Sequence, residues 1–381
     1  MEITSASVPS PAAGEAATLF VVLELSKARW LVAIHSPRAD KISRHTIEGG
    51  DAPALLNLIG RMRDQAQHHL GTPVRVVSCF EAGYDGFWLH RVLVAHGIEN
   101  HVMDPASLPV DRRTRRVKTD RLDLGLLMRA LMAWCRGEPQ VCRMVRVPTP
   151  EEEDCRRRSR ERERLVNERV QHIGRIKGLL MTQGIRDYQP TRTDWRRRLD
   201  ELRTGDGQTL PPHLKAELER EGRRLWLVMD MLAELEATRD QDREEPATKQ
   251  ALALSRFTGI GPTSAHVLVG EVFHREFGNR RELAAYFGLA PSHHSSGTVH
   301  RDQGIAKSGN ARARRVAVEV AWLWLRFQPG STLSRWFHER SGTGRGRMRR
   351  VLIVALARKL MIALWRYLAI GIVPEGALLK S

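Results

Sequence analysis

The chain has few cysteines, and their spacing excludes a metal or disulfide framework. Only four occur in 381 residues: Cys79, Cys135, Cys142 and Cys155. None belongs to a C-x-x-C pair, and none has a histidine partner at the spacing of a zinc site. We therefore predict reduced thiols in the core or on the surface.

A hydrophobic run long enough to cross a membrane is also missing. The most apolar stretch, residues 351–370, carries Arg358, Lys359 and Arg366, whereas a membrane span needs about 18 residues with few or no charges. This stretch predicts a buried amphipathic helix. The first residues lack the basic start and apolar core of a secretory signal, so we expect a cytoplasmic protein with a disordered leader over residues 1–18.

Acidic residues are too few to balance the basic ones. Lys and Arg total 61 against 44 Asp and Glu, which leaves a formal charge of +17. An excess of this size predicts a polyanionic partner, and we expect that partner to be nucleic acid. A length of 381 residues exceeds what one hydrophobic core supports, so we expect two or three domains.

The first of these regions, residues 19–148, alternates strand and helix patterns. Residues 19–35 predict two strands around a tight turn, and residues 74–80 and 98–103 predict one strand each. One helix precedes the last strand and another follows it. The order β-β-β-α-β-α predicts an α/β layer.

The second region, residues 149–249, has the pattern of two long helices separated by a polar break with glycine and proline. The helices, over residues 151–183 and after residue 212, repeat apolar residues at three- and four-residue steps. The stripes are Val166, Val170, Ile173, Ile176 and Leu180 on the first helix, and Leu218, Leu225, Val228, Leu232 and Leu235 on the second. They predict an antiparallel coiled-coil hairpin. The third region, residues 250–381, is expected to be mostly helical.

Four acidic residues of the first region stand where carboxylates could share a metal ion. Glu24 lies in an apolar strand pattern and Glu81 directly follows another, and a buried charge needs a partner or a metal. Asp120 and Asp123 are three apart on a predicted helix, so they share a face. Clustered carboxylates that hold divalent cations support phosphodiester chemistry. The plainer alternative is a set of solvated charges.

Basic and glycine-bearing segments supply candidate contacts to nucleic acid. The run D-R-R-T-R-R-V-K at 111–118 places positive charge directly before the Asp pair, although such runs are often solvated loops. The turn G-I-G-P precedes a helix whose backbone N–H groups could bind phosphate, or it is simply a tight turn. The candidate nucleic-acid-binding residues are Arg112, Arg113, Arg115, Arg116, Lys118, Gly259, Gly261, Lys307, Asn310, Arg312, Arg314 and Arg315.

A predicted loop at residues 290–301, A-P-S-H-H-S-S-G-T-V-H-R, is rich in serine and histidine. A serine that attacks a phosphodiester needs electropositive surroundings. The segment that follows the loop, K-S-G-N-A-R-A-R-R, supplies them. The alternative is a structural loop, and composition alone does not choose among its serines.

Several motifs, in this order along the chain, resemble the DEDD transposases of bacterial insertion sequences. That family is related to the Piv-type DNA invertases and is described as bridge-RNA-guided serine recombinases. The motifs are L-E-L-S-K, F-E-A-G-Y, V-K-T-D-R-L-D, T-P-E-E-E, G-I-G-P, Y-F-G-L-A-P-S-H-H-S-S-G, I-A-K-S-G-N-A-R-A-R-R and A-L-A-R-K-L. The resemblance covers nearly all of the chain between residues 19 and 370.

The resemblance implies a RuvC-like, RNase-H-fold N-terminal domain, a coiled-coil region used in assembly and a C-terminal transposase domain. It implies Mg²⁺ held by an acidic tetrad that falls on Glu24, Glu81, Asp120 and Asp123. It also implies a composite active site in which a serine forms a covalent phosphoserine link with DNA. The family's serine before glycine falls on Ser296, with Ser295 as the alternative.

The partners implied by the resemblance are donor and target double-stranded DNA, a noncoding guide RNA and further copies of the chain, as a dimer or tetramer. The protein would then associate with the bacterial nucleoid when it acts. Position 24 departs from the family, which usually has Asp there. One more methylene moves the carboxylate by roughly 1.5 Å, enough to alter the geometry around an ion that demands near-ideal coordination.

Two other hypotheses stay open beside the recombinase. One is a RuvC-like, structure-specific nuclease, in which a metal-activated water replaces the serine. The other is a nucleic-acid-binding assembly protein whose catalysis has decayed through the change at Glu24.

Overall fold

The chain folds into two compact units that divide between Pro148 and Thr149. The computed structural model describes residues 17–37, 39, 41–108, 120–138, 140–241, 245–296, 299–342 and 346–380, with the backbone only at 120–123, 239–241, 292–296 and 299–303. The expected leader lies outside the described residues up to residue 16. Its last two residues instead begin the first strand.

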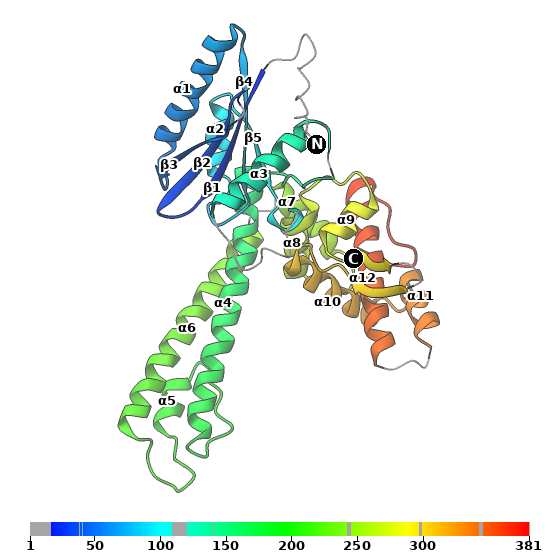
Figure 1. Ribbon diagram of the computed structural model, residues 1–381. Coiled ribbons are helices and arrows are strands. Elements are labelled where there is room, and N and C mark those ends of the chain that lie inside the picture. Colours follow the sequence, from blue (N-terminus) through cyan, green and yellow to red (C-terminus); the bar gives the residue numbers. More distant parts are fainter. Residues whose placement is uncertain are drawn as a thin grey trace. The chain divides into compact units, whose positions relative to one another are not determined.

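The first unit is built on a five-stranded sheet of order β3-β2-β1-β4-β5 (Figure 1). β1 pairs in parallel with β4, and β4 with β5, whereas β2 runs antiparallel to both of its neighbours. The strands are β1 (Ala17–Leu25), β2 (Arg29–His35), β3 (Ser43–Glu48), β4 (Val74–Glu81) and β5 (Glu99–Met103).

Helices cover both faces of this sheet, so the predicted α/β class is confirmed. α1 (Ala52–Leu70) and α2 (Trp88–Ala95) bury apolar side chains against one face, and α3 (Asp120–Cys135) packs on the other. The central strands are apolar almost throughout because both of their faces are covered. A short 3₁₀ helix, η1 (Pro105–Ser107), follows β5.

The predicted order β-β-β-α-β-α is incomplete, because β3 and α1 were not expected. β3, S-R-H-T-I-E, is an edge strand in which Ile47 is the only large apolar residue, so its pattern is weak. α1 did carry boundary signals. The side chain of Asp51 accepts a hydrogen bond from the backbone N–H of Ala54, and Gly71 ends the helix in the left-handed conformation.

The second unit begins with the predicted helical hairpin, formed by α4 (Pro150–Met181) and α6 (Pro212–Gln241). α4 starts at a capping box between Thr149 and Glu152. Ion pairs of Arg162 with Glu236 and of Arg175 with Glu217 show the antiparallel pairing. A short helix, α5 (Trp195–Asp200), lies in the connection and packs against α6.

One residue of the predicted apolar stripes is wrong. Val170 is 59% exposed, whereas Leu165, which the prediction omitted, is buried against Val228 and Leu232. Val166 is half-buried and packs against this same cluster, so only Val170 departs from the predicted stripe. The remaining stripe residues are buried or half-buried between the helices.

The rest of the second unit is mostly helical, as predicted, and encloses its own core around Phe257, Trp324 and Phe337. The expected serine loop is instead a two-stranded hairpin, because residues 291–296 pair with residues 299–305 as antiparallel strands. The elements are α7 (Pro246–Ser255), α8 (Pro262–Leu268), the π-helical turn η2 (Val269–Phe273), α9 (Arg280–Tyr286), β6 (Pro291–Ser296), β7 (Val299–Ile305), α10 (Ala311–Phe327), α11 (Thr332–Ser341) and α12 (Arg347–Ile370).

In the part of the chain that the structure describes, no helix combines the length and the apolar composition that crossing a membrane requires. The stretch expected to be a buried amphipathic helix lies within α12, which buries Ile353, Leu360 and Leu364. The four cysteines are free thiols. Burial raises the pKa of each of them, so none is an activated nucleophile.

Candidate functional site

Two predicted acidic residues lie side by side at one edge of the first unit's sheet. β1 and β4 pair in parallel with Leu23 opposite Phe80, and the next residues in this register are Glu24 and Glu81. Strands that run in parallel end at the same edge. The pairing therefore brings together two carboxylates that are 57 positions apart in the sequence.

Both carboxylates belong to the sheet face that α3 covers. Side chains alternate between faces along a strand, and Val22 and Cys79, two positions earlier on each strand, pack against α3. Glu24 and Glu81 line a cavity of about 740 Å³, whose wall also includes Leu127 of α3. Glu24 is half-buried, with its Oε2 atom buried, and Glu81 is exposed.

The other two members of the predicted tetrad are the first and fourth residues of α3, Asp120 and Asp123. Their side chains lie outside the described part of the structure, so whether they reach the cavity stays a prediction. Their positions are one turn before Leu124 and Leu127, which pack on the sheet. Among the side chains that are described, no group of three or more His, Cys, Asp or Glu is arranged to hold a metal ion.

Four more polar residues line the same cavity and were not predicted: Ser26, Lys27, Tyr84 and Asp85. They follow the two strands in the short segments L-S-K and A-G-Y-D-G. Gly86, with φ of 65°, closes the second segment as a tight turn. Position directly after a predicted strand was the signal that could have found them. Asp85 adds a half-buried carboxyl group to the cavity wall.

The predicted nucleophiles lie in the second unit, on the β6–β7 hairpin. Ser295 pairs with His300, and Ser296 pairs with Val299 as the last residue of β6. Both serines therefore stand at the end of β6, opposite the first residues of β7. Their side chains are outside the described part, so the choice between them stays a prediction.

The base of this hairpin is fixed by close contact between two motifs singled out in the sequence. Residues 286–290 lie against residues 306–310, joined by backbone hydrogen bonds from Ala306 to Ala290 and from Asn310 to Tyr286. A Cβ atom at Gly309 would overlap backbone atoms of Tyr286 and Gly288 in the first motif. Y-F-G-L-A-P and A-K-S-G-N are thus two halves of one clamp.

A buried carboxylate, Glu271 on η2, anchors this clamp. Its side chain is 2% exposed and accepts hydrogen bonds from Arg160 of α4 at 2.8 and 3.0 Å, from Asn310 at 2.9 Å and from Arg312 at 3.1 Å. Asn310 also caps α10, because its side chain accepts from the backbone N–H of Ala313. Glu271 therefore joins the helical hairpin to the start of α10.

The electrostatics of this cluster favour a permanently ionised carboxylate. Burial alone would raise the pKa of Glu271, but hydrogen bonds from Arg160 and Asn310 and the charge of Arg160 outweigh it and lower the pKa to about 2. Glu163 behaves similarly. Its burial raises the pKa, and bonds from Arg315 and Arg312 lower it further than burial raises it.

Comparison with known proteins assigns the chain to a family. A protein of Sinorhizobium fredii whose name describes it as a transposase is 50% identical over 378 residues, which cover 95% of each chain. The sequence profile of the transposase IS116/IS110/IS902 family matches residues 251–334. The chain belongs to this transposase family. A transposase for insertion sequence element IS1111A from Coxiella burnetii is 27% identical over 293 residues, which cover 73% of this chain and 74% of that one.

The matched span of the transposase contains the serine hairpin, its clamp and Glu271. Most basic residues predicted there to contact nucleic acid hold the fold together. Arg312 and Arg315 pair with Glu163, and Arg314 donates to the backbone carbonyls of Phe287 and Lys307. Arg315 nevertheless keeps 62% of its side chain exposed. The other basic residues predicted to contact nucleic acid lie outside the described residues: Arg112, Arg113, Arg115, Arg116 and Lys118.

The predicted phosphate-binding turn of the transposase is a tight connection between α7 and α8. Gly259 has a φ of 94°, and a Cβ there would crowd Phe327. Gly261 is the N-cap of α8, whose seven residues make just under two turns. Lys307, another predicted contact, is exposed and has a φ of 58°, a conformation that costs free energy for residues other than glycine.

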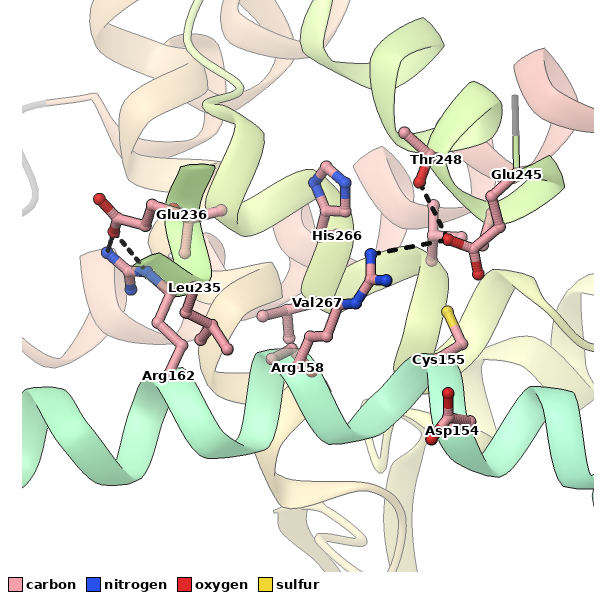
Figure 2. Close-up of a pocket in the computed structure, with 14 residues that line it drawn as sticks. Asp154, Cys155, Arg158, Arg162, Leu235, Glu236, Glu245, Thr248, His266 and Val267 are labelled. Carbon is pink, nitrogen blue, oxygen red and sulfur yellow. Dashed lines mark hydrogen bonds and ion pairs between the residues drawn. The ribbon is translucent and has the colours of Figure 1, made fainter. Parts of the chain in front are cut away.

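The transposase has a second, smaller cavity of about 70 Å³ among α4, α6, α7 and α8 (Figure 2). Figure 2 shows Arg162 paired with Glu236, and Arg158 paired with Glu245, which also accepts from Thr248. This volume has room for a few water molecules only. Together with its internal ion pairs, the size indicates a packing defect between helices and not a nucleotide site.

Proposed function

We propose that this transposase cuts and rejoins DNA through a covalent phosphoserine link, with Mg²⁺ held by an acidic tetrad. The observation that carries the proposal is the adjacency of Glu24 and Glu81 at the ends of two parallel strands. The sheet order 3-2-1-4-5, with the second strand antiparallel, supports a RuvC-like, RNase-H-type fold for the first unit. Family membership supports DNA transposition as the overall reaction.

The residues present fit a divalent cation. Glu24 and Glu81 offer carboxylate oxygens, the hard donors that Mg²⁺ prefers, and they share one cavity with Asp85. Asp120 and Asp123 would complete the donor set from the start of α3. A bound ion would stabilise negative charge that develops on the phosphate oxygens. Glu24 and Glu81 are held by the sheet itself, so the spacing between these two carboxylates does not depend on a loop.

The serine would supply the attacking oxygen. Ser296 Oγ would lose its proton and bond to phosphorus, while the bond from phosphorus to one sugar oxygen breaks and that oxygen leaves with a proton. The resulting phosphate ester on the protein conserves the bond, so attack by another sugar hydroxyl can rejoin the DNA without ATP. The clamp at the hairpin base would keep this serine in a defined position.

A covalent trap tests the mechanism. We would incubate the chain and Mg²⁺ with nicked duplexes made from the DNA that flanks its gene, and look for a protein–DNA adduct by denaturing electrophoresis. Loss of the adduct in Ser296→Ala with retention in Ser295→Ala supports the assignment, and the opposite pattern moves the nucleophile by one residue. Cleavage without any adduct in both variants would refute the serine mechanism and favour the nuclease.

The acidic residues need their own controls. Glu81→Gln should abolish adduct formation while leaving the unfolding temperature nearly unchanged, because Glu81 is exposed. Glu24→Asp should maintain or raise activity if Glu24 is a metal ligand. Complete loss in Glu24→Asp would mean that the pocket is built around the longer side chain. Inactivity of the unaltered chain, with DNA binding intact, would favour the decayed assembly protein.

We further propose a structured noncoding RNA as a partner that selects the DNA sequence by base pairing. Protein contacts would then go mainly to nucleic-acid backbones, in keeping with the net charge of +17. Sequencing the RNA that copurifies with the chain tests this proposal. Recovery of one RNA encoded beside the gene supports it, whereas a random sample of cellular RNA contradicts it. The same purification would report the oligomeric state.

A further inference from the structure

A strongly basic surface lies on α11 and α12. α12 carries six Arg or Lys residues in 24 and no acidic residue, and α11 carries a single acid, Glu339. Six exposed cations make up what we name the α11–α12 basic surface: Arg335, Arg340, Arg347, Arg349, Arg350 and Lys359. None of these six forms an ion pair within the described residues.

Aromatic rings hold three of these cations in place. Arg340 and Lys359 both lie over the ring of Trp336, at 5.3 and 4.8 Å from its centroid, and Arg349 lies 5.5 Å from the centroid of Trp322. The two tryptophans belong to α11 and α10, so the contacts join three helices. Such contacts orient a cation without neutralising it. The positive charge stays available to an outside anion.

This arrangement is unfavourable for the isolated protein. Arg347, Arg349 and Arg350 lie in the first turn of α12, where the helix dipole is positive and acidic residues are preferred. Arg340 and Lys359 share one ring although they repel each other. Folding by itself does not account for cations gathered at these positions. A polyanion that binds here would offset both repulsions.

We propose that the α11–α12 basic surface binds the phosphate backbone of double-stranded DNA. The inference rests on the proposed function, since it assigns a DNA-holding surface to the transposase. Arg347 and Lys359 are 12 residues apart, or roughly 18 Å along the helix axis. Over that length a duplex presents on the order of 10 phosphate charges.

The aromatic residues favour a duplex over a single strand. Proteins that hold single strands stack bases on free aromatic faces. Here the rings of Trp322 and Trp336 already have cations over them, and Trp336 is half-buried. The surface is therefore suited to a partner whose bases are stacked inside and whose phosphates are outside. It would hold DNA without reading its sequence.

The test compares two triple variants with equal loss of charge. R347Q/R349Q/R350Q removes three cations from the first turn of α12, and the control K177Q/R220Q/R223Q removes three exposed cations from the helical hairpin. The probe is a fluorescein-labelled 40-base-pair duplex of arbitrary sequence, and anisotropy gives the binding constant from 50 to 200 mM salt. A matched RNA duplex and vesicles of anionic phospholipid serve as the other arms.

We expect the slope of log K against log salt to fall by about 0.9 for each phosphate contact that is lost, and so by up to about 2.7 in R347Q/R349Q/R350Q. Across this salt range, the affinity of the variant should then drop by up to about 40-fold less than that of the unaltered chain. The control should keep the original slope. The variant should also melt no earlier than the unaltered chain, because it removes cations from a helix N-terminus, so weaker binding would not reflect unfolding.

An unchanged slope for duplex DNA would overturn the proposal, as would an equal change in the control variant. If the triple variant binds only the RNA duplex or only the vesicles more weakly, the result would overturn the proposal in favour of that partner. Adduct formation by the unaltered chain is measured separately. A positive adduct with an unchanged DNA slope would refute this surface alone and leave the proposed function standing.

Discussion

Glu271→Gln should destabilise the second unit, because it removes the charge that two arginines share. The pKa of Glu271 lies at about 2 in the folded protein against 4.5 for the free group. At about 1.4 kcal/mol for each pKa unit, this difference corresponds to about 3 kcal/mol of stabilisation at neutral pH. Arg160 and Arg312 are partly exposed, so solvent screening reduces the loss of stability. We expect the free energy of unfolding to fall by about 2–4 kcal/mol.

Urea unfolding at pH 7, followed by tryptophan fluorescence, measures this change, since Trp324 is buried in the same unit. The matched control is Glu168→Gln on α4. Glu168 pairs with Arg164 on the exposed helix surface, at 2.9 Å and one turn away. An exposed pair of this kind contributes under about 0.5 kcal/mol. A Glu271→Gln variant as stable as this control would refute the reasoning.

The pH dependence separates charge from shape. A carboxyl group whose pKa is lowered by folding stabilises the protein fully above the pKa of the unfolded chain, and the effect is lost as pH falls toward the folded pKa. The stability difference between the unaltered chain and Glu271→Gln should therefore be constant above about pH 5 and shrink between about pH 4.5 and 2. A difference that persists unchanged at pH 2.5 would mean that packing, and not charge, carries the effect.

Three further predictions concern packing and thiol reactivity. Gly222→Ala should lower the free energy of unfolding by about 1–3 kcal/mol, because the added Cβ would overlap the ring of Trp195. Gly174→Ala, where the added Cβ meets open space, should be neutral or stabilising. Urea unfolding compares the two variants. Gly309→Ala should lower adduct yield more than Gly174→Ala does, because it opens the hairpin clamp; equal yields would contradict this. Cys79 should resist alkylation in the native protein and react after unfolding, as mass spectrometry would show, because burial raises its pKa.

The candidate site could be predicted only in part. Glu24 and Glu81 were found because one lies within an apolar strand pattern and the other directly follows one, where an acid is unexpected. The parallel pairing that makes them neighbours was not readable, because register depends on how strands far apart in the chain align. Asp85 and Lys27 were missed for the same reason. They matter only once the strand ends share an edge.

Local pattern by itself determined the long helices, the apolar central strands and the basic excess, because these depend on residues close together in the chain or on composition alone. Tertiary structure decided the rest. The segment expected to be a serine loop forms a hairpin, since strand pairing needs both strands in place. Tertiary structure also placed Glu271 at the centre of a charge cluster. That carboxylate looks ordinary in the sequence, because its partners at 160 and 312 come together only when separate helices pack.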